Sequence, residues 1–343
     1  MFPDFIDIIN AIVLLSNFVI IPAIAYGSQL ALGALGITMI YAVLRFSNFA
    51  HGDLMAFGTA ITILFTWWFQ SMGIGFGFLP TALLALPIGI LFAGALALLF
   101  DRSVYRFYRK KKSPNVTFVI ASVGVMFMMN GIVRFIIGPA DQRFNDGTRF
   151  LIKAREFKKM TGLDEGLGIK YSQVLTVVVT VIAVALLFWF LQKTRTGKSM
   201  RAYSDNEDLA LLSGINPERV VLITWLIVGA LATTAGVLYG LDKSFKPFIY
   251  LQLLLPMFAA AILGGVGNPV GAILGGFVIA FSEVMITYPL KKLFKYLSPS
   301  DTAPEGLVQL LAVDYKFAVS FVILVLVLLI RPTGILKGRV IND

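Results

Sequence analysis

Residues 172–191 read SQVLTVVVTVIAVALLFWFL, which is a run of twenty residues without a charged side chain. A helix of about 20 residues rises about 30 Å, which matches the hydrocarbon thickness of a bilayer. Similar apolar runs, bounded by charges or by glycine and proline, recur along the chain. They predict nine membrane spans, near 27–44, 54–70, 78–100, 116–137, 172–191, 219–241, 251–266, 269–288 and 315–330.

A further apolar stretch, residues 5–23, precedes these spans. The following Ala23-Ile24-Ala25 resembles a signal-peptide cleavage site, but the first basic residue of the chain is Arg45, so a basic leader region is lacking. We therefore interpret 5–23 as a retained helix that either spans the membrane or lies at its surface. The sequence predicts an all-α polytopic membrane protein with about eight to ten transmembrane helices.

Composition excludes the main soluble classes. Hydrophobic residues make up 58% of the 343 residues and charged residues only 14%. A soluble enzyme, a nucleic-acid-binding protein or a disordered chain needs far more polar surface. The net charge of +10 is explained by basic residues that flank apolar spans, where anionic lipids lie. The absence of cysteine excludes disulfides, thiolate metal sites and cysteine nucleophiles.

Charge in the short loops predicts the orientation. Six basic residues and no acidic residue lie between Arg102 and Lys112, so we assign this loop to the cytoplasm. Alternating the spans from there places 193–218, the turn at 266–269 and the tail from Arg331 inside, and 138–171, 241–250 and 290–314 outside. We expect one transmembrane domain over 1–343. It would consist of an extra N-terminal helix (5–23), a first helix group (27–137), an external loop (138–171) and a second helix group (172–338) that contains the loop 193–218.

Few ionisable side chains lie at membrane depth, and these are functional candidates because burying charge in a bilayer is costly. His51 and Asp53 begin the second span, and Glu283 interrupts the eighth. The simplest interpretation of His51 is a helix-start residue bonded to backbone, since one histidine does not make a metal site. Asp53 is most simply a charge near a helix N-terminus. For Glu283, a paired structural carboxylate and a transport role are equally favoured.

Glycines cluster around Asn268-Pro269, between two apolar spans. Small residues that are separated by three other residues let helix backbones approach closely in lipid. The interruption by Pro269 also predicts a tight or re-entrant turn whose backbone could line a cavity. The glycines concerned are Gly264, Gly265, Gly267, Gly271, Gly275 and Gly276.

The loop at 193–218 contains Thr196-Gly197-Lys198-Ser199, but this is not a phosphate-binding loop. The first glycine of that motif would fall at Gln192, and the segment follows a membrane helix instead of a strand. No nucleotide site is visible in the sequence.

The second part of this loop predicts a short amphipathic helix. Ser204 and Glu207 have capping-box spacing, Gly214 suits the helix end, and Asn216-Pro217 suits the start of the next span. A helix of about ten residues is marginal alone in water, so its apolar side chains need a surface to cover. That surface is either the inner face of the membrane or a groove in a partner protein. The apolar side chains are Leu209, Leu211, Leu212 and Ile215.

Several stretches, in a constant order over most of 27–338, resemble the LivH-like permeases of high-affinity branched-chain amino acid ABC importers. They are Asn48-Phe49-Ala50-His51-Gly52-Asp53, Val104-Tyr105-Arg106, Arg201-Ala202, Leu211-Leu212-Ser213-Gly214-Ile215-Asn216, Arg219-Val220, Ala235-Gly236-Val237-Leu238-Tyr239-Gly240, Gly264-Gly265-Val266-Gly267, Gly271-Ala272 and Arg331-Pro332-Thr333-Gly334-Ile335-Leu336.

The resemblance implies a multi-pass protein of a bacterial inner membrane. It would pair with a second, homologous permease, two cytoplasmic ATPase subunits and a periplasmic solute-binding protein. The chain itself would be no enzyme and hold no cofactor, because ATP and Mg²⁺ would bind the ATPases. The loop would be the coupling helix that enters an ATPase groove.

The candidate residues fall into two sets. For the coupling loop they are Arg201, Ala202, Asp208, Leu209, Leu212, Gly214, Ile215 and Asn216. For the translocation path they are Asn48, His51, Gly52, Asp53, Gly264, Gly265, Gly267, Gly271 and Glu283.

Other functions stay open. Sister permeases for urea and short amides share these motifs, so the solute is not fixed by the resemblance. A proton-coupled secondary carrier using His51, Asp53 and Glu283 is a rival class, and a membrane scaffold without transport activity is a third.

Overall fold

The computed structural model describes residues 5–75, 77, 79–146, 149–297, 309–312, 315–331 and 333–336. Parts of the predicted 1–343 domain and of the predicted 290–314 loop lie outside these residues. So do Pro332 and most of the C-terminal tail.

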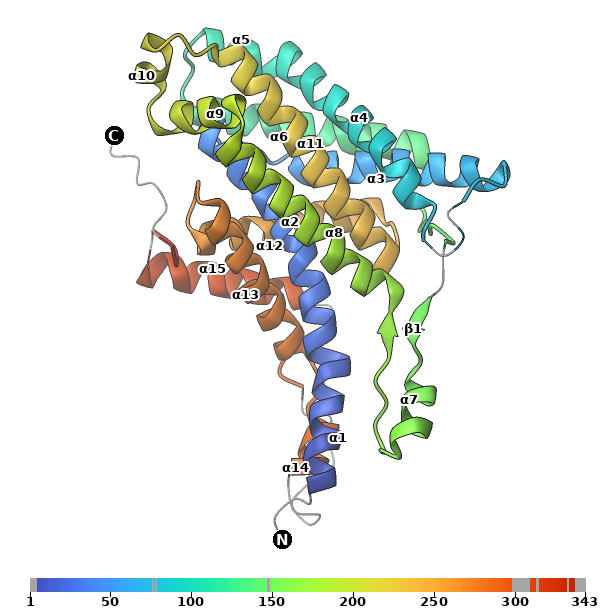
Figure 1. Cartoon of the computed structure of the whole chain (residues 1–343). Coiled ribbons are helices and arrows are strands. Elements are labelled where there is room, and N and C mark those ends of the chain that lie inside the picture. Colours follow the sequence, from blue (N-terminus) through green and yellow to red (C-terminus); the bar gives the residue numbers. More distant parts are fainter. Residues whose placement is uncertain are drawn as a thin grey trace.

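Figure 1 shows an elongated bundle of helices. Within the described residues, eight helical runs are long and apolar enough to cross a membrane. The prediction of an all-α polytopic membrane protein is therefore confirmed. The runs are Phe5–Leu44 (α1, η1 and α2), His51–Ser71 (α3), Ala82–Lys110 (α4, η2 and α5), Asn115–Ile137 (α6), Tyr171–Lys193 (α8), Pro217–Asp242 (α11), Pro247–Gly264 (α12) and Pro269–Thr287 (α13).

The predicted span at 315–330 is a shorter helix than a membrane crossing needs. It forms α15, Lys316–Ile330, with 15 residues. At 1.5 Å per residue this helix is about 22 Å long, which is less than the hydrocarbon core.

The sequence predicts an extra N-terminal helix at 5–23. In the structure this stretch is not separate from the first predicted span. It continues without interruption through α1 (Phe5–Leu15) and the π-helical turn η1 (Ser16–Ile20) into α2 (Ile21–Leu44). Pro22 lies in the first turn of α2, directly after η1, where the widened turn accommodates a residue without an N–H. The run of 40 residues is about 60 Å long, twice the bilayer core, so one part of it lies outside the hydrocarbon region.

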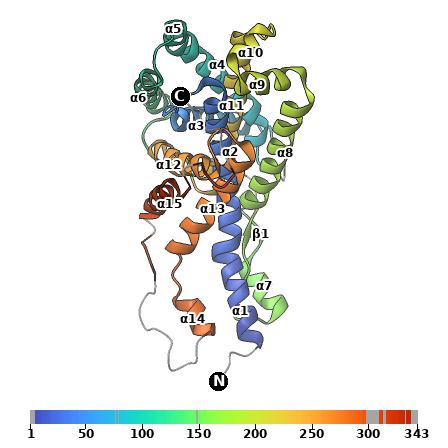
Figure 2. The same cartoon turned by 90° about the vertical axis from the view of Figure 1, so that its left-hand side faces the viewer.

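Figures 1 and 2 show that α1 forms one end of the molecule together with short elements from two other segments. These are the antiparallel pair β1 (Phe150–Ile152) and β2 (Ile169–Lys170), helix α7 (Ala154–Thr161) and helix α14 (Lys291–Leu297).

Side-chain amides of the N-terminal helix hold this end together. Asn10 Oδ1 accepts a hydrogen bond from the backbone of Glu165, and Asn17 Oδ1 accepts one from Gly168. Tyr296 on α14 donates to the Glu165 carboxylate at 3.1 Å. Glu165 and Gly168 of the segment 138–171 and Tyr296 of the segment 290–314 therefore lie at the same end, as the predicted orientation requires. We name it the external end.

At the opposite end, the basic segment 102–112 is mostly helical, and its prediction as a loop was wrong. Helix α4 (Ala82–Phe100) continues through η2 (Asp101–Tyr105) and α5 (Arg106–Lys110). Basic residues in a last helical turn are stabilised by the negative end of the helix dipole. Arg106 forms an ion pair with Glu218 on α11, with an N–O distance of 2.6 Å. This pair joins the two segments predicted to be inside, and we name their end the cytoplasmic end.

The core between these ends is packed through small residues. A Cβ at Gly58 of α3 would lie 2.1 Å from Thr233 Oγ1 of α11, and a Cβ at Gly229 of α11 would lie 3.0 Å from the Gly94 nitrogen of α4. Such contacts let helices associate in lipid, where the hydrophobic effect between helices is lost.

Candidate coupling and translocation site

The predicted coupling helix consists of two helices, α9 (Arg195–Asp205) and α10 (Glu207–Leu212). Asn206 separates them in an extended conformation, and its Oδ1 accepts a hydrogen bond from the Leu209 amide at 3.0 Å. Asn206 is therefore the N-cap of α10, because its side chain satisfies an amide of the first turn. The predicted capping box from Ser204 is wrong, since Ser204 lies in the last turn of α9.

The predicted end of this segment is confirmed. Gly214 has φ +79°, in the left-handed region that glycine adopts without strain, and the Ile215 amide donates back to the Ala210 carbonyl at 3.0 Å. Asn216 Oδ1 then accepts from the Glu218 and Arg219 amides, so that α11 begins at Pro217.

The helix pair presents apolar side chains that no described part of the chain covers. Leu209 is 62% exposed and Leu212 is 86% exposed, whereas Ala210 between them is buried. Arg201, Ala202 and Asp208 are also exposed on the pair. An uncovered leucine pair on a capped helix is suited to docking in an apolar groove.

The other face of the pair is fixed to the bundle. Tyr203 is buried and donates a hydrogen bond of 2.6 Å to Glu207, which connects α9 to α10. Burial, and then the neighbouring Glu207 carboxylate, raise the pKa of Tyr203 well above its ordinary value, so Tyr203 stays a donor at neutral pH. Arg45 at the end of α2 donates to the Ser204 carbonyl. Motion of α9 is thereby connected to α2.

The Thr-Gly-Lys-Ser motif lies in the first turns of α9, shortly after the N-cap residue Thr194. Thr194 Oγ1 accepts from the Gly197 amide at 3.0 Å and caps α9. A Cβ at Gly197 would lie 2.1 Å from the Phe190 carbonyl oxygen, so this close approach of two backbones requires glycine. The glycine is explained by packing, in agreement with the rejection of a phosphate-binding loop.

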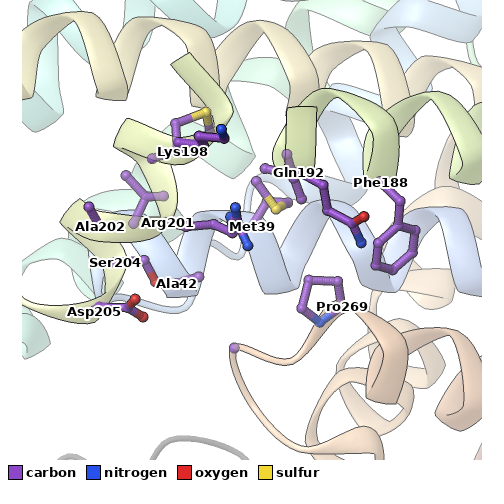
Figure 3. A pocket seen from close by; sticks show the side chains of 14 residues that line it. Met39, Ala42, Phe188, Gln192, Lys198, Arg201, Ala202, Ser204, Asp205 and Pro269 are labelled. Carbon is purple, nitrogen blue, oxygen red and sulfur yellow. The ribbon is translucent and has the colours of Figure 1, made fainter. Parts of the chain in front are cut away.

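A pocket of about 580 Å³ lies between α9 and the cytoplasmic ends of α2, α8 and α13 (Figure 3). It places Arg201 and Ala202 of the predicted coupling segment beside Gly267 of the predicted path. The residues labelled in Figure 3 are Met39, Ala42, Phe188, Gln192, Lys198, Arg201, Ala202, Ser204, Asp205 and Pro269.

The glycine cluster forms a tight turn between α12 and α13. A Cβ at Gly264 would lie 2.0 Å from the Gly271 carbonyl oxygen, and one at Gly271 would lie 2.1 Å from the Gly264 carbonyl oxygen. Gly265 and Gly267 have positive φ values of 107° and 82°. The Ile335 amide also donates to the Leu263 carbonyl at 2.7 Å, so the C-terminal motif packs against this turn.

Four further path candidates, Asn48, His51, Gly52 and Asp53, lie at the start of α3 and do not line this pocket. Asn48 Oδ1 accepts from the Ala50 amide and from the Tyr105 hydroxyl, so it holds the helix start against η2. His51 is fully buried, and its ring lies 2.5 Å from the position of a Cβ at Gly36 on α2. A Cβ at Gly52 would lie 2.6 Å from the Tyr250 carbonyl oxygen of α12.

The ionisable candidates contact three different helices. His51 packs against α2, Asp53 accepts a hydrogen bond of 2.9 Å from Asn130 of α6, and Glu283 accepts one from Ser320 of α15. Among the described residues, none of the three hydrogen-bonds to another of them. Asp53 lies in the first turn of α3, as its structural interpretation predicts. The predicted hydrogen bond of His51 to backbone is not found, because neither ring nitrogen of His51 has a hydrogen-bond partner among the described residues. Asp53 Oδ2 and Glu283 Oε2 are likewise buried without a partner there.

Comparison with known proteins assigns the chain to a family. Residues 19–328 match the family described as branched-chain amino acid transport system / permease component. The chain belongs to this family. It is therefore related to transport permeases over nearly its whole length.

Named relatives agree with this assignment. The chain is 31% identical to the high-affinity branched-chain amino acid transport system permease protein LivH of Escherichia coli K12, over 92% of this chain and 93% of the relative. It is 29% identical to BraD of Pseudomonas aeruginosa, over 93% and 95%. It is 28% identical to a probable LivH of Methanocaldococcus jannaschii, over 91% and 90%.

Sequence reasoning missed a buried network in this permease. Trp225 of α11 donates to Asp101 Oδ1 at 2.8 Å, and Arg109 binds both oxygens of the same carboxylate. The Tyr105 ring stacks on Trp225 with a centroid distance of 5.5 Å. The only signal in the sequence was the presence of Tyr105 in a stretch that resembles the family. Its partner on α11 is more than a hundred residues away, and no periodic pattern links the two.

Proposed function

We propose that this permease is the membrane-spanning subunit of an ATP-driven importer in a bacterial inner membrane, and that it carries branched-chain amino acids or a related small polar solute. It acts with a second homologous permease, two cytoplasmic ATPases that bind ATP and Mg²⁺, and a periplasmic solute-binding protein. The observation that supports the proposal most strongly is the 31% identity to LivH over 92% of this chain.

In this proposal the pair α9–α10 enters a groove of an ATPase subunit. The exposed Leu209 and Leu212 supply the apolar contact, and Asn206 and Gly214 set the ends of the presented helix. The ATPase can shift the permease between two conformations only if it binds this pair differently in the two states. A capped, firmly attached helix is suited to this because the force is not lost in local fraying.

The movement of α9 would then reach the translocation path through the pocket in Figure 3. Arg201 and Ala202 line one wall, and Gly267 and Pro269 line the opposite wall. A displacement of α9 changes the width of this pocket at the cytoplasmic ends of α2 and α13. We infer that the pocket is part of the inner mouth of the path.

The proton-coupled carrier is the alternative that uses His51, Asp53 and Glu283. A proton relay needs ionisable groups in a connected series. Among the described residues, no hydrogen bond joins any two of these three side chains. The lack of a connected series favours the ATP-driven importer.

Uptake by proteoliposomes tests the proposal. The complete importer, loaded with ATP on the ATPase side, should accumulate labelled leucine, and unlabelled valine or isoleucine should compete. Competition by urea or acetamide in place of these amino acids would assign the chain to an amide-carrying permease instead. The permease alone, given a proton gradient without ATP, should accumulate nothing. Accumulation under that condition would establish the secondary carrier.

A further inference from the structure

A second pocket, of about 280 Å³, lies between the α4–η2–α5 run and the start of α11 at the cytoplasmic end. Its apolar wall consists of Leu98, Leu222 and Ile223, and its polar wall carries four arginines and two carboxylates. Leu222 is 42% exposed and the neighbouring Leu99 is 60% exposed. Both helices belong to runs that are long and apolar enough to cross a membrane, so exposed leucines on them are suited to contact with lipid. The pocket therefore lies where the apolar surface of the bundle meets the charged cytoplasmic end.

The two carboxylates of the pocket are already occupied. Glu218 binds Arg106 through both of its oxygens, and Asp101 binds Arg109 in the same two-contact manner. Each pair is electrically neutral. They account for two of the four arginines.

The other two arginines, Arg102 and Arg219, are exposed. Within the part of the chain that the structure describes, neither has a carboxylate oxygen within 4.0 Å. They come from different helices, yet line the same pocket. The pocket thus has a net charge of +2 next to a lipid-facing apolar wall.

We propose that this pocket binds the phosphate headgroup of an anionic phospholipid of the cytoplasmic leaflet. A guanidinium donates two parallel hydrogen bonds to phosphate oxygens, and two guanidiniums from different helices clamp one phosphate. Basic pockets between membrane helices on the cytoplasmic side suit such headgroups. The acyl chains then lie along Leu98, Leu222 and the exposed Leu99, which a soluble phosphate compound would leave uncovered.

A bound lipid would join the basic segment to the start of α11 beside the Arg106–Glu218 pair. This site concerns a lipid and does not depend on which solute the permease carries. Its presence and the proposed transport function can therefore be tested separately.

Native mass spectrometry of the full-length permease tests the site. The permease is first placed in nanodiscs that contain phosphatidylcholine and phosphatidylglycerol and is then transferred into detergent. The phosphatidylglycerol molecules that stay bound to it are counted. The wild type should retain phosphatidylglycerol in preference to phosphatidylcholine. Each arginine removed should weaken retention about fivefold, so Arg102→Gln/Arg219→Gln should lose nearly all of it. The matched control is Lys110→Gln/Lys111→Gln, which removes the same charge outside the pocket and should change retention less than twofold.

Three results would overturn the proposal. The first is equal retention by the two double variants, which would indicate attraction to the whole basic surface. The second is retention of phosphatidylcholine as readily as phosphatidylglycerol. The third is displacement of the lipid by millimolar inorganic phosphate, which would point to a soluble phosphate compound. Arg102→Lys, which keeps the charge and loses the two-contact geometry, provides a milder variant if the double substitution disturbs folding, and it too should weaken retention.

Discussion

The α9–α10 pair and the α12–α13 turn lie at the same end of the permease, and α9 and the turn line the same pocket, but the two regions use their residues in opposite ways. The pair exposes Leu209 and Leu212 and buries its attachment to the bundle. In the turn, by contrast, the backbones of Gly264 and Gly271 lie so close that neither position has room for a Cβ. The difference separates a surface suited to a partner from a joint that holds the fold. Substitutions in the two regions should therefore fail in different ways.

The largest effect is expected at the α12–α13 turn. Gly271→Val places a side chain against the Gly264 carbonyl, where even a Cβ would lie 2.1 Å from the oxygen. Overpacking of this kind costs about 1–3 kcal/mol, and more where only backbone can move. We expect the variant to disappear from the membrane or to unfold at a much lower temperature in detergent. Gly131→Val on α6 is the control, because a Cβ at Gly131 meets nothing within 4 Å. Equal stability of the two variants would contradict the packing role of Gly271.

The second prediction concerns the exposed pair. Leu212→Asp should abolish transport and substrate-stimulated ATP hydrolysis in the complete importer, because it puts a charge into the expected apolar contact. The side chain is 86% exposed, so the amount and thermal stability of the permease should not change. Met160→Asp is the control, since Met160 is 87% exposed at the external end. Normal transport by the Leu212 variant would remove α10 from the coupling contact.

The fold could be predicted from the sequence because each span is a long apolar run, and the bilayer allows few alternatives to a helix at such a place. The turn at Gly264–Gly271 and the caps at Gly214 and Asn216 could also be predicted, because glycine and asparagine act there through local backbone geometry. The continuity of the helix at 5–23 with α2 could not be predicted. It depends on a single widened turn before Pro22, and the apolar pattern on both sides is compatible with either one helix or two.

The position of the candidate site was only partly predictable, because it depends on contacts between segments that are far apart in the sequence. The sequence identified Arg201 and Gly267 separately, but their meeting in one pocket depends on how α9 folds back onto α2 and α13. Arg45 links α9 to α2 through the Ser204 carbonyl, a contact between residues far apart in the sequence. Serine followed by glutamate three residues later is a strong local signal, and it predicted the cap at Ser204. That prediction was wrong because α9 continues through Asp205, and Asn206 supplies the capping oxygen instead.

A smaller effect is expected for the ion pair that joins the cytoplasmic segments. Arg106→Glu or Glu218→Arg alone places like charges together and should lower both transport and thermal stability modestly. The charge-swapped double variant should recover most of the loss. The pair is exposed to water, so a coupling energy of about 0.5–1 kcal/mol is expected from a double-mutant cycle. A cycle with no coupling would show that the two segments are held together by packing alone, for example by Trp225 against Tyr105.

The smallest effect is expected at the N-cap of α10. It should distinguish the α9–α10 pair further from the α12–α13 turn. Asn206→Ala removes the acceptor of the Leu209 amide, which costs about 1 kcal/mol in a typical helix. Because α10 has only six residues, this loss should be seen as faster amide hydrogen exchange over 207–212, with exchange in α12 and α13 unchanged. Ser213→Ala is the control, since its hydroxyl only donates to a carbonyl that already accepts the Ser213 amide. If coupling requires α10 to be preformed, transport should fall a few-fold in the Asn206 variant while the ATPases still bind. Unchanged transport with faster exchange would mean instead that the helix becomes ordered only in the ATPase groove.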